Sequence, residues 1–287
     1  MLAVLGLAGA PEPSSTREPA AATAATVVAV GDIASCTQTE DEEVAELVGR
    51  IDPDALLTTG DNVYSNGTPE EFAECYDPAW GRFLDRTYPS PGNHDYGTPD
   101  AAGYFDYFGD RAPAAYYSFD LAGWHLVSLN SEIDRSWGSP QIDWLRRDLR
   151  RDRHRCELLY WHRARWSGGA HGSSEYSQDL WRAAHEAGVD LVLVGHDHNY
   201  QRFRRLDARG RPDRRYGVVQ IVAGMGGRSH YDAGEIRHRV AVNDDTSGVL
   251  QLRLRRESFG LRFVPIEGGT YSDAVRSAGC HGPRPDR

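Results

Sequence analysis

The chain has 287 residues, 40% of them hydrophobic and 26% charged, and its net charge is −10. That apolar content is sufficient for a packed core, which excludes an intrinsically disordered chain. No apolar segment reaches the ~18–20 residues of a membrane-spanning helix, and the acidic balance argues against non-specific nucleic-acid binding. Every basic residue is an arginine, so lysine-based catalysis is also excluded.

The N-terminal segment has features of a secretory signal. Residues 2–10 are apolar and end in Ala-Gly-Ala, and a Pro/Ser/Thr/Ala-rich stretch follows to about residue 25. The positively charged start of a signal peptide is missing, which an incorrectly assigned start codon would explain. We therefore expect residues 1–25 to be a signal-like or disordered leader, followed by a single domain over residues 26–287.

Short apolar segments that end in polar turns predict strands buried on both faces. Two segments with apolar residues at helical spacing lie between them. The alternation of strand and helix indicates an α/β protein with a partly parallel sheet. The predicted strands are Val27–Val30, Ala55–Thr59, Leu158–Trp161 and Leu191–Val194, and the helical segments are Val44–Ile51 and Ile142–Leu149.

Two further segments have the pattern of antiparallel hairpins that close a sheet edge. One covers residues 116–130 with a turn near Ala122-Gly123, and the other covers residues 249–265 with a turn near Ser258–Gly260. The polar turns after the strands would have to converge on one site, which is why we expect one domain rather than two.

The four cysteines form an even set without a Cys-x-x-Cys pair, which argues against a thiolate zinc site. We predict the disulfides Cys36–Cys75 and Cys156–Cys280. The two other connectivities, and four free buried thiols, remain open at this point. Paired cysteines, together with the leader, favour a secreted or otherwise extracytoplasmic protein.

Residue types that bind metals follow the predicted strands. Ligand sites in open α/β sheets lie at the carboxyl ends of the strands, so these side chains should meet. They are more numerous than one metal requires, and nitrogen and oxygen donors suit zinc, iron or manganese. The residues are Asp32, Asp61, His162, His196 and His198, and the turn at 91–95 adds Asn93 and His94.

The order of these motifs resembles that of the calcineurin-like metallophosphoesterase superfamily, from about Val27 to Val264. The motifs are Gly-Asp at 31–32, Gly-Asp-Asn-Val-Tyr at 60–64, Gly-Asn-His-Asp at 92–95, one histidine at 162 and Gly-His-Asp-His at 195–198. The first motif usually reads Asp-x-His, but here it reads Asp32-Ile33-Ala34. A tyrosine three residues after Asp61 is instead typical of the purple acid phosphatase branch, although Tyr64 could also be an ordinary packing residue.

The resemblance implies a four-layer α-β-β-α sandwich, in which two mixed sheets are flanked by helices, and a centre of two metal ions. Asp32, Asp61, Tyr64 and His198 would bind Fe(III), with Asp61 bridging. The second ion, Fe(II), Zn(II) or Mn(II), would be completed by the three remaining ligands, Asn93, His162 and His196. The Gly-Asp-x-Gly of the branch and the accessory domain of its plant members are missing, which implies a small bacterial relative.

The resemblance also suggests residues that act on the substrate. Asn93 and His94 would face the phosphate, His94 would protonate or polarise it, and Asp95 would orient His94. His171 lies nine residues after His162, where the branch has a substrate-facing histidine, although a surface-loop role is the alternative.

Two positions are weaker candidates for substrate binding. Arg163 could bind a phosphate oxygen or form a surface ion pair, and the latter is favoured. His230, in a Gly-Gly-Arg-Ser-His loop, is a candidate for the rim of the site.

The implied function is hydrolysis of small phosphate esters by a purple acid phosphatase-like phosphomonoesterase. Hydroxide on the metal ions would attack phosphorus in line, and His94 or His171 would assist the leaving oxygen. One alternative is a phosphodiesterase that acts on cyclic nucleotides or phospholipid head groups. The other is a scaffold that kept the fold and lost the metals. Nothing in the sequence indicates the oligomeric state.

Overall fold

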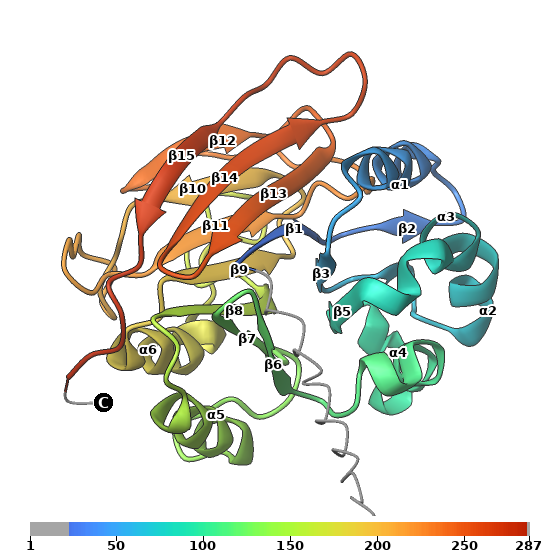
Figure 1. The fold of residues 1–287 in the computed structure, drawn as a ribbon. Coiled ribbons are helices and arrows are strands. Elements are labelled where there is room, and N and C mark those ends of the chain that lie inside the picture. Colours follow the sequence, from blue (N-terminus) through green and yellow to red (C-terminus); the bar gives the residue numbers. More distant parts are fainter. Residues whose placement is uncertain (1–22, 286–287) are drawn as a thin grey trace, which may run out of the picture.

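The structure is a computed structural model that describes residues 23–285, in which two large β-sheets face each other (Figure 1). The first sheet has six strands in the order β15-β14-β13-β1-β3-β5. Strands β1, β3 and β5 are parallel, and the other three pair antiparallel. The strands are β1 (Ala24–Val30), β3 (Ala55–Thr59), β5 (Thr87–Ser90), β13 (Gly248–Arg255), β14 (Ser258–Pro265) and β15 (Ala274–Gly279).

The second sheet has seven strands in the order β12-β10-β11-β9-β8-β7-β6. Its centre, β11-β9-β8-β7, is parallel, and antiparallel pairs lie at both edges. The strands are β6 (Tyr117–Leu121), β7 (Trp124–Ser128), β8 (Cys156–Arg163), β9 (Leu191–Gly195), β10 (Tyr200–Phe203), β11 (Val219–Ala223) and β12 (Arg239–Asn243). A small parallel pair consists of β2 (Ala34–Ser35) and β4 (Val63–Tyr64).

Three apolar clusters hold the layers together. One fills the space between the sheets, and each of the others lies beneath helices on an outer face. This arrangement confirms the predicted four-layer α-β-β-α sandwich with two mixed sheets (Figure 1). The helices are α1 (Glu40–Ile51), α2 (Pro69–Glu71), α3 (Asp77–Trp80) and α4 (Ala102–Phe108) on the first sheet, and α5 (Pro140–Arg151) and α6 (Gln178–Ala187) on the second.

Both predicted helical segments are helices. The first turn of α1 consists of four acidic residues, whose charges are favourable at the positive end of the helix dipole. Helix α5 begins after Ser139, whose hydroxyl accepts a hydrogen bond from the Ile142 amide at 3.3 Å, and Pro140 occupies its first position. In each helix the apolar residues at helical spacing pack against the adjacent sheet, and all are buried except Ile51, which is half-buried.

The first hairpin is confirmed, whereas the turn of the second is wrongly predicted. Ala122 and Gly123 connect β6 to β7, and both have positive φ, as a tight hairpin turn requires. The second turn lies at Arg256-Glu257, because Gly260 is inside β14 and marks a bulge against β15. The edge of that sheet is therefore β15, a strand that the sequence pattern did not predict.

The predicted leader lies mostly outside the described residues, which begin at residue 23. Strand β1 begins at Ala24, so residues 24 and 25 belong to the first sheet rather than to the leader. Within residues 23–285, no helix has the length and apolar character needed to cross a membrane.

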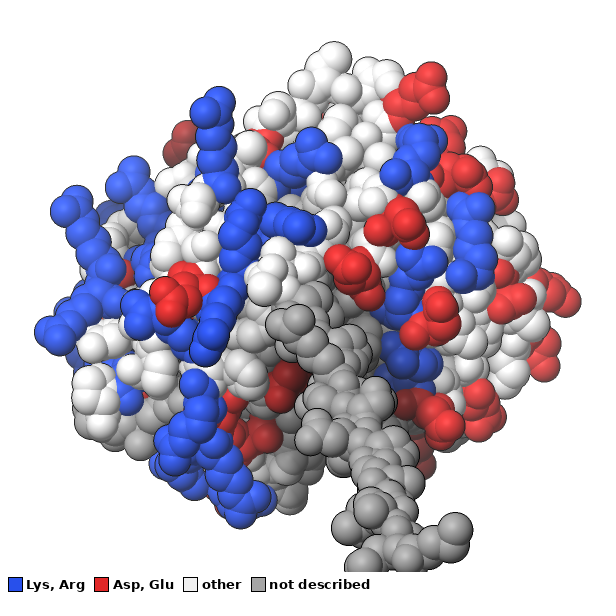
Figure 2. All heavy atoms as spheres, in the orientation of Figure 1, with Lys and Arg blue, Asp and Glu red and all other residues white. Residues whose placement is uncertain are grey.

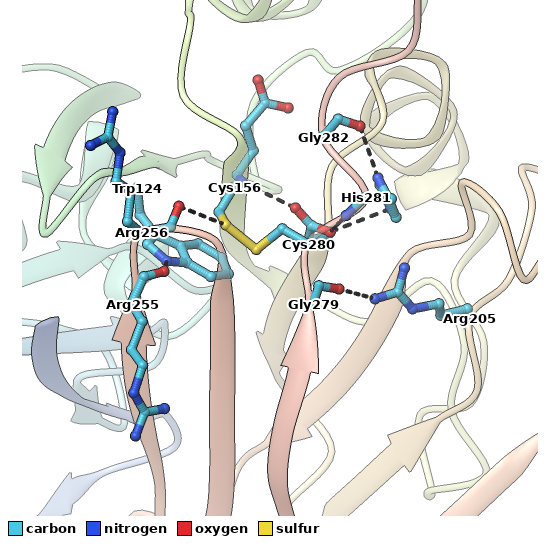
Figure 3. Close-up of a disulfide and its surroundings, with 11 residues drawn as sticks. Trp124, Cys156, Arg205, Arg255, Arg256, Gly279, Cys280, His281 and Gly282 are labelled. Carbon is cyan, nitrogen blue, oxygen red and sulfur yellow. Dashed lines mark hydrogen bonds and ion pairs between the residues drawn. A yellow bond between two sulfur atoms is a disulfide. The ribbon is translucent and has the colours of Figure 1, made fainter. Parts of the chain in front are cut away.

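Both predicted disulfides are present. Cys36 and Cys75 join the segment after β2 to the helical region before α3, with their Cα atoms 5.0 Å apart. Cys156, at the start of β8, is bonded to Cys280, which follows β15 (Figure 3). Because β8 and β15 belong to different sheets, this disulfide links the two central layers.

Charged side chains are distributed unevenly over the molecule. In the view of Figure 2, arginines gather on the side of α6 and the C-terminal strands, and carboxylates gather on the side of α1–α4. Most of the arginines follow residue 145 in the sequence. The net charge is therefore an average over an arginine-rich side and a carboxylate-rich side. That the protein has no nucleic-acid-binding surface stays a prediction.

The disulfides allow a test of stability. Removing the second link as Cys156→Ala/Cys280→Ala should lower the free energy of unfolding by about 2–4 kcal/mol. Removing Cys36 and Cys75 should cost about 1 kcal/mol less, because that link closes 39 residues rather than 124. Denaturant unfolding measures both values.

Thiol titration of the unreduced, denatured chain should find no reactive thiol, and four would contradict the pairing.

Candidate metal centre

The candidate site lies where the carboxyl ends of the parallel strands of both sheets meet. The Gly31 amide, after β1, donates to the Ala223 carbonyl at the end of β11 at 2.8 Å, which joins the sheets. The Asp32 amide donates to the Gly60 carbonyl at 3.1 Å, which holds the loops after β1 and β3 together. The ends of β1, β3 and β11 thus meet at one place.

One group of donor atoms surrounds the phenol of Tyr64. Its oxygen lies 3.0 Å from Asp32 Oδ1, 3.2 Å from Asp61 Oδ2 and 3.1 Å from His198 Nε2. The exposed fraction of each of these residues is 4% or less. Three predicted ligands are therefore within contact distance of a fourth, Tyr64, although the four come from three separate loops.

A second group surrounds His162 at the end of β8. Its Nε2 lies 3.2 Å from Asp61 Oδ2, 3.2 Å from Asn93 Oδ1 and 3.1 Å from His196 Nδ1. Asp61 Oδ2 thus belongs to both groups, and no other atom in either group does so. The seven residues predicted as metal ligands are brought together as two sets that share one carboxylate oxygen.

The outer ring nitrogens of two histidines, His162 and His198, are bonded to backbone carbonyls. His162 Nδ1 lies 2.9 Å from the Thr59 carbonyl, and His198 Nδ1 lies 2.6 Å from the Ser229 carbonyl. A carbonyl only accepts, so each of these nitrogens donates, and Nε2 of each ring faces the site. Such outer partners fix the orientation of metal-binding histidines in proteins. Neither carbonyl was predictable from the sequence, because a backbone acceptor has no side-chain signal.

The backbone is strained at three of the candidate ligands. Asp32, Asp61 and His196 have φ values of 58°, 49° and 72°, in the left-handed region that such residues rarely adopt. A close approach also explains one glycine, because a Cβ atom on Gly92 would overlap the Asp61 carboxylate. The carboxylates are therefore directed inward by a conformation that the surrounding fold enforces.

Burial and mutual repulsion perturb the ionisable groups. Burial, together with the charge of Asp61, raises the pKa of Asp32 to about 8. Burial also acts to raise the pKa of Asp61, but the adjacent His162 reverses this and lowers it. Burial and the charge of His162 lower the pKa of His196 to about 2, and burial lowers that of His198 to about 4. Both imidazoles are thus neutral: Nε2 of His198 presents its lone pair to the site, whereas Nε2 of His196 accepts from the Arg163 guanidinium.

These donors fit a pair of metal ions. Buried carboxylates without a counter-charge are unfavourable, and besides His162 they face a phenol, a carboxamide and neutral imidazoles. Nitrogen and oxygen donors of this kind bind iron, zinc and manganese. Asp61, His162 and His196 also have ligand atoms within 4.8 Å of one another, as binding to one ion requires.

His94 lies at the opening of the site, but Asp95 does not orient it as predicted. The His94 ring packs against Tyr64 with centroids 4.4 Å apart, and its Nδ1 donates to the Ser65 carbonyl at 2.6 Å. Asp95 is fully buried and instead accepts from the side chain of Asn62 at 2.9 Å and from the Gly92 amide at 2.8 Å. Its carboxylate therefore supports the loop that carries His94 rather than the ring.

His171 also lies beside the site, and its loop is held by Asp197, which was not predicted from the sequence. The His171 ring stacks on that of His196 with centroids 4.0 Å apart. Asp197 accepts from the His171 amide at 2.8 Å and from the Ser167 hydroxyl. The signal was available, because Asp197 lies between the two histidines of Gly-His-Asp-His.

The two weaker candidates for substrate binding have other contacts. Arg163 donates from Nε to Glu132 at 3.0 Å and from Nη1 to His196 Nε2 at 3.0 Å. Its guanidinium thus forms an ion pair, the favoured alternative, and a substrate-binding role for Arg163 stays a prediction. His230 contacts the Ser247 hydroxyl at 2.8 Å, which makes it a support of its loop.

Two further side chains border the site without having been predicted. Tyr231 stacks on His198 with centroids 4.1 Å apart and an interplanar angle of 13°. The guanidinium of Arg228 lies 5.0 Å from the centre of the Tyr64 ring. Both follow β11 in the loop that was selected for His230, and only the folded chain shows which of its residues faces the site.

Comparison with known proteins agrees with this geometry. A family model described as calcineurin-like phosphoesterase matches residues 25–200, and the chain belongs to that family. Purple acid phosphatase 15 of Arabidopsis thaliana is 28% identical over 247 residues, which cover 70% of this chain and 44% of that protein. The chain spans about half or less of the length of the curated relatives that it matches first.

Solved structures show the same fold at low sequence identity. The purple acid phosphatase PPD1 from yellow lupin (Lupinus luteus) has a TM-score of 0.72 and 17% identity, over 90% of this chain and 55% of that one. GAP50 of Plasmodium, described as the anchor in the inner membrane complex, has a TM-score of 0.69 and 14% identity, over 88% and 89% of the two chains.

The packing around Asp61 can be tested with one methyl group. Gly92→Ala places a Cβ atom against the Asp61 carboxylate and should lower the free energy of unfolding by about 1–3 kcal/mol. Gly279→Ala is the matched control, because a Cβ atom there has no neighbour within 4 Å. Its effect should stay within about 0.5 kcal/mol. Equal unfolding midpoints for the two variants would contradict the close approach.

Proposed function

We propose that this protein is a purple acid phosphatase-like phosphomonoesterase that binds two metal ions. The observation that carries the proposal is the position of Asp61, whose Oδ2 contacts both the Tyr64 phenol and His162 Nε2 at 3.2 Å. A carboxylate oxygen shared by two complete donor sets is the arrangement that two adjacent ions require.

The ligands are assigned by these two sets. The first ion, Fe(III), takes Asp32, Asp61, Tyr64 and His198, and a phenol supports this choice because its anion is a hard ligand. The second ion takes Asp61 together with Asn93, His162 and His196. When bound, the pair polarises a phosphoryl oxygen and lowers the pKa of water for attack on phosphorus.

His94 supplies the proton for the leaving oxygen. Its Nδ1 donates to the Ser65 carbonyl, which fixes the ring and leaves Nε2, 4.0 Å from Asp61 Oδ2, on the open side of the site. The side chain is 37% exposed, so a substrate can reach it. A histidine fixed in this way at the edge of the metal centre is suited to general acid catalysis.

His171 binds the phosphate from the opposite wall. Stacking on His196 and the hydrogen bond from its amide to Asp197 hold the ring at the opening. Asp197 is then a positioning residue, because it fixes the loop that carries His171 and has no contact with the reacting atoms.

Two alternatives are separated by a defined experiment. The same donors could serve a phosphodiesterase, and GAP50 shows that the fold also occurs in a protein described as an anchor. The purified protein is loaded with iron plus zinc or manganese, its metal content is measured, and monoesters and diesters are assayed side by side. Faster turnover of monoesters with two bound ions supports the proposal. Diester preference or no turnover at full loading contradicts it.

We also propose an extracytoplasmic location. The two disulfides support it, because disulfides persist in oxidising compartments. Fractionation of cells that produce the full chain tests this, and a protein confined to the cytoplasm with reduced thiols would contradict it.

The role of Tyr64 is visible in the absorption spectrum. A phenolate bound to ferric iron produces a charge-transfer band, so the oxidised, iron-loaded protein should be purple or pink. Tyr64→Phe keeps the ring but removes the oxygen within 3.2 Å of both carboxylates, so the colour should disappear while the fold remains. Tyr76→Phe is the control, because Tyr76 is also a buried tyrosine but packs in the aromatic cluster near α3. A colourless wild-type protein with bound iron would leave Tyr64 as a packing residue.

His94→Ala tests the proton donor. Turnover should fall by about 10²–10⁴-fold while both ions stay bound, because His94 is not among the ligands. His230→Ala is the control, since His230 contacts Ser247 and its loss should change turnover little. Loss of metal in His94→Ala, with normal turnover per loaded site, would reverse the assignment.

A further inference from the structure

A second group of metal-binding side chains lies at the other end of the second sheet. Its four residues come from different elements: β6 and β7, the segment that ends α5, and the segment before β8. We call it the His125 cluster, and it consists of Asp120, His125, Asp152 and His154. Each residue offers one ligand atom, and these four atoms lie within 4.8 Å of one another.

The distances in the His125 cluster alternate around a ring. His125 Nδ1 lies 2.8 Å from Asp120 Oδ1 and 3.9 Å from Asp152 Oδ1. His154 Nδ1 lies 2.6 Å from Asp152 Oδ1 and 3.8 Å from Asp120 Oδ1. Ligands of a tetrahedral zinc ion with bonds of about 2.0 Å are about 3.3 Å apart. The observed contacts lie on both sides of that value, so small side-chain rotations would equalise them.

A contact outside the ring of four supports the orientation of His125. Its Nε2 lies 2.8 Å from Asp148 Oδ2, on α5. An imidazole that donates one N–H to a carboxylate and directs its other nitrogen at a set of donors has the arrangement typical of zinc-binding histidines. The cluster therefore has, in addition to four donors, the outer carboxylate that a metal site uses.

The His125 cluster is separate from the proposed catalytic centre. His125 in β7 is opposite Glu157 in β8, and His162 lies five residues further along that strand. At about 3.3 Å per residue the two places are roughly 17 Å apart. The Asp120 side chain is 60% exposed and that of His154 30%, so an ion can enter from solvent.

We propose that the His125 cluster is a structural site for a divalent cation of the zinc type, bound by two imidazoles and two carboxylates. Two imidazoles and two carboxylates complete a four-coordinate N₂O₂ set, which suits zinc. The ion would fasten the β6–β7 hairpin to the end of α5 and the start of β8. This site is independent of the proposed catalytic function.

The alternative is an ion-pair network in which protonated histidines lie between carboxylates, and a zinc-binding measurement separates the two. The full-length chain with Asp61→Asn/His196→Ala, which weakens the catalytic centre, is freed of metal with a chelator. Zinc is then added, the excess is removed by gel filtration, and bound zinc is measured by mass spectrometry.

This background should retain one zinc per chain, and adding His154→Ala should abolish it. Adding His185→Ala should not, because His185 is a comparable histidine on α6 that contacts a single carboxylate, Asp213, at 3.2 Å. Adding Asp148→Asn should weaken zinc binding about 10–100-fold without removing a ligand. Zinc should also raise the unfolding temperature of the background variant and leave that of the His154→Ala variant unchanged.

Equal zinc content with and without His154 would overturn the proposal, as would a zinc-dependent stabilisation that survives His154→Ala. If the background variant does not fold, the same comparison is made in the otherwise unchanged chain, where His154→Ala should remove one zinc of the total. Phosphatase activity does not enter either measurement, so failure of the proposed catalytic function and failure of this proposal are distinguishable.

Discussion

The fold has to enclose negative charge where its two sheets meet. Asp32 and Asp61 are almost completely buried, and the Tyr64 phenol contacts both. Carboxylates in such a place lose hydration and repel each other, so a compensating positive charge must lie within a few ångströms. Without metal, His162 supplies it: burial opposes protonation, but the adjacent carboxylates raise its pKa to about 10. The residues that would hold two cations are therefore also those whose charges must balance in the protein alone.

The architecture brings this charge together by the direction of its strands. In both sheets the parallel strands end at the same edge, and the Gly31–Ala223 hydrogen bond closes the two edges on each other. The backbone at position 92 passes so close to the Asp61 carboxylate that a Cβ atom would overlap it, which is why this position is a glycine. The left-handed conformations of Asp32 and Asp61 are unfavourable locally, and the packing of two sheets and their loops compensates for them.

The fold alone does not define the activity, because the purple acid phosphatase PPD1 and the anchor protein GAP50 match this chain with similar TM-scores. The donor sets support the phosphatase that we propose, since two buried carboxylates beside a phenol are suited to bound cations. The His125 cluster follows the same chemistry at the opposite ends of the strands. There, however, Asp120 and His154 are partly exposed, so the donors have room to bind an ion without strain in the backbone.

The sequence by itself left the disulfide connectivity open while favouring the pairing that is present, and it indicated the strands that precede the site, two of the helices and the order of the candidate ligands. These depend on local features: apolar runs such as Leu191–Val194, helical spacing in α1, and polar residues directly after strands. It also indicated Tyr64, because the distance of three residues from Asp61 is a local property of one loop.

Only the tertiary structure decided the contacts between segments that are distant in the sequence. Strand β15 has little apolar character and exists because β14 pairs with it. Asp95 turned toward Asn62, Arg163 toward Glu132 and His196, and His230 toward Ser247, none of which local spacing specifies. A polar side chain bonds to whichever partner the packing leaves nearby, and that partner is known only after the chain has folded.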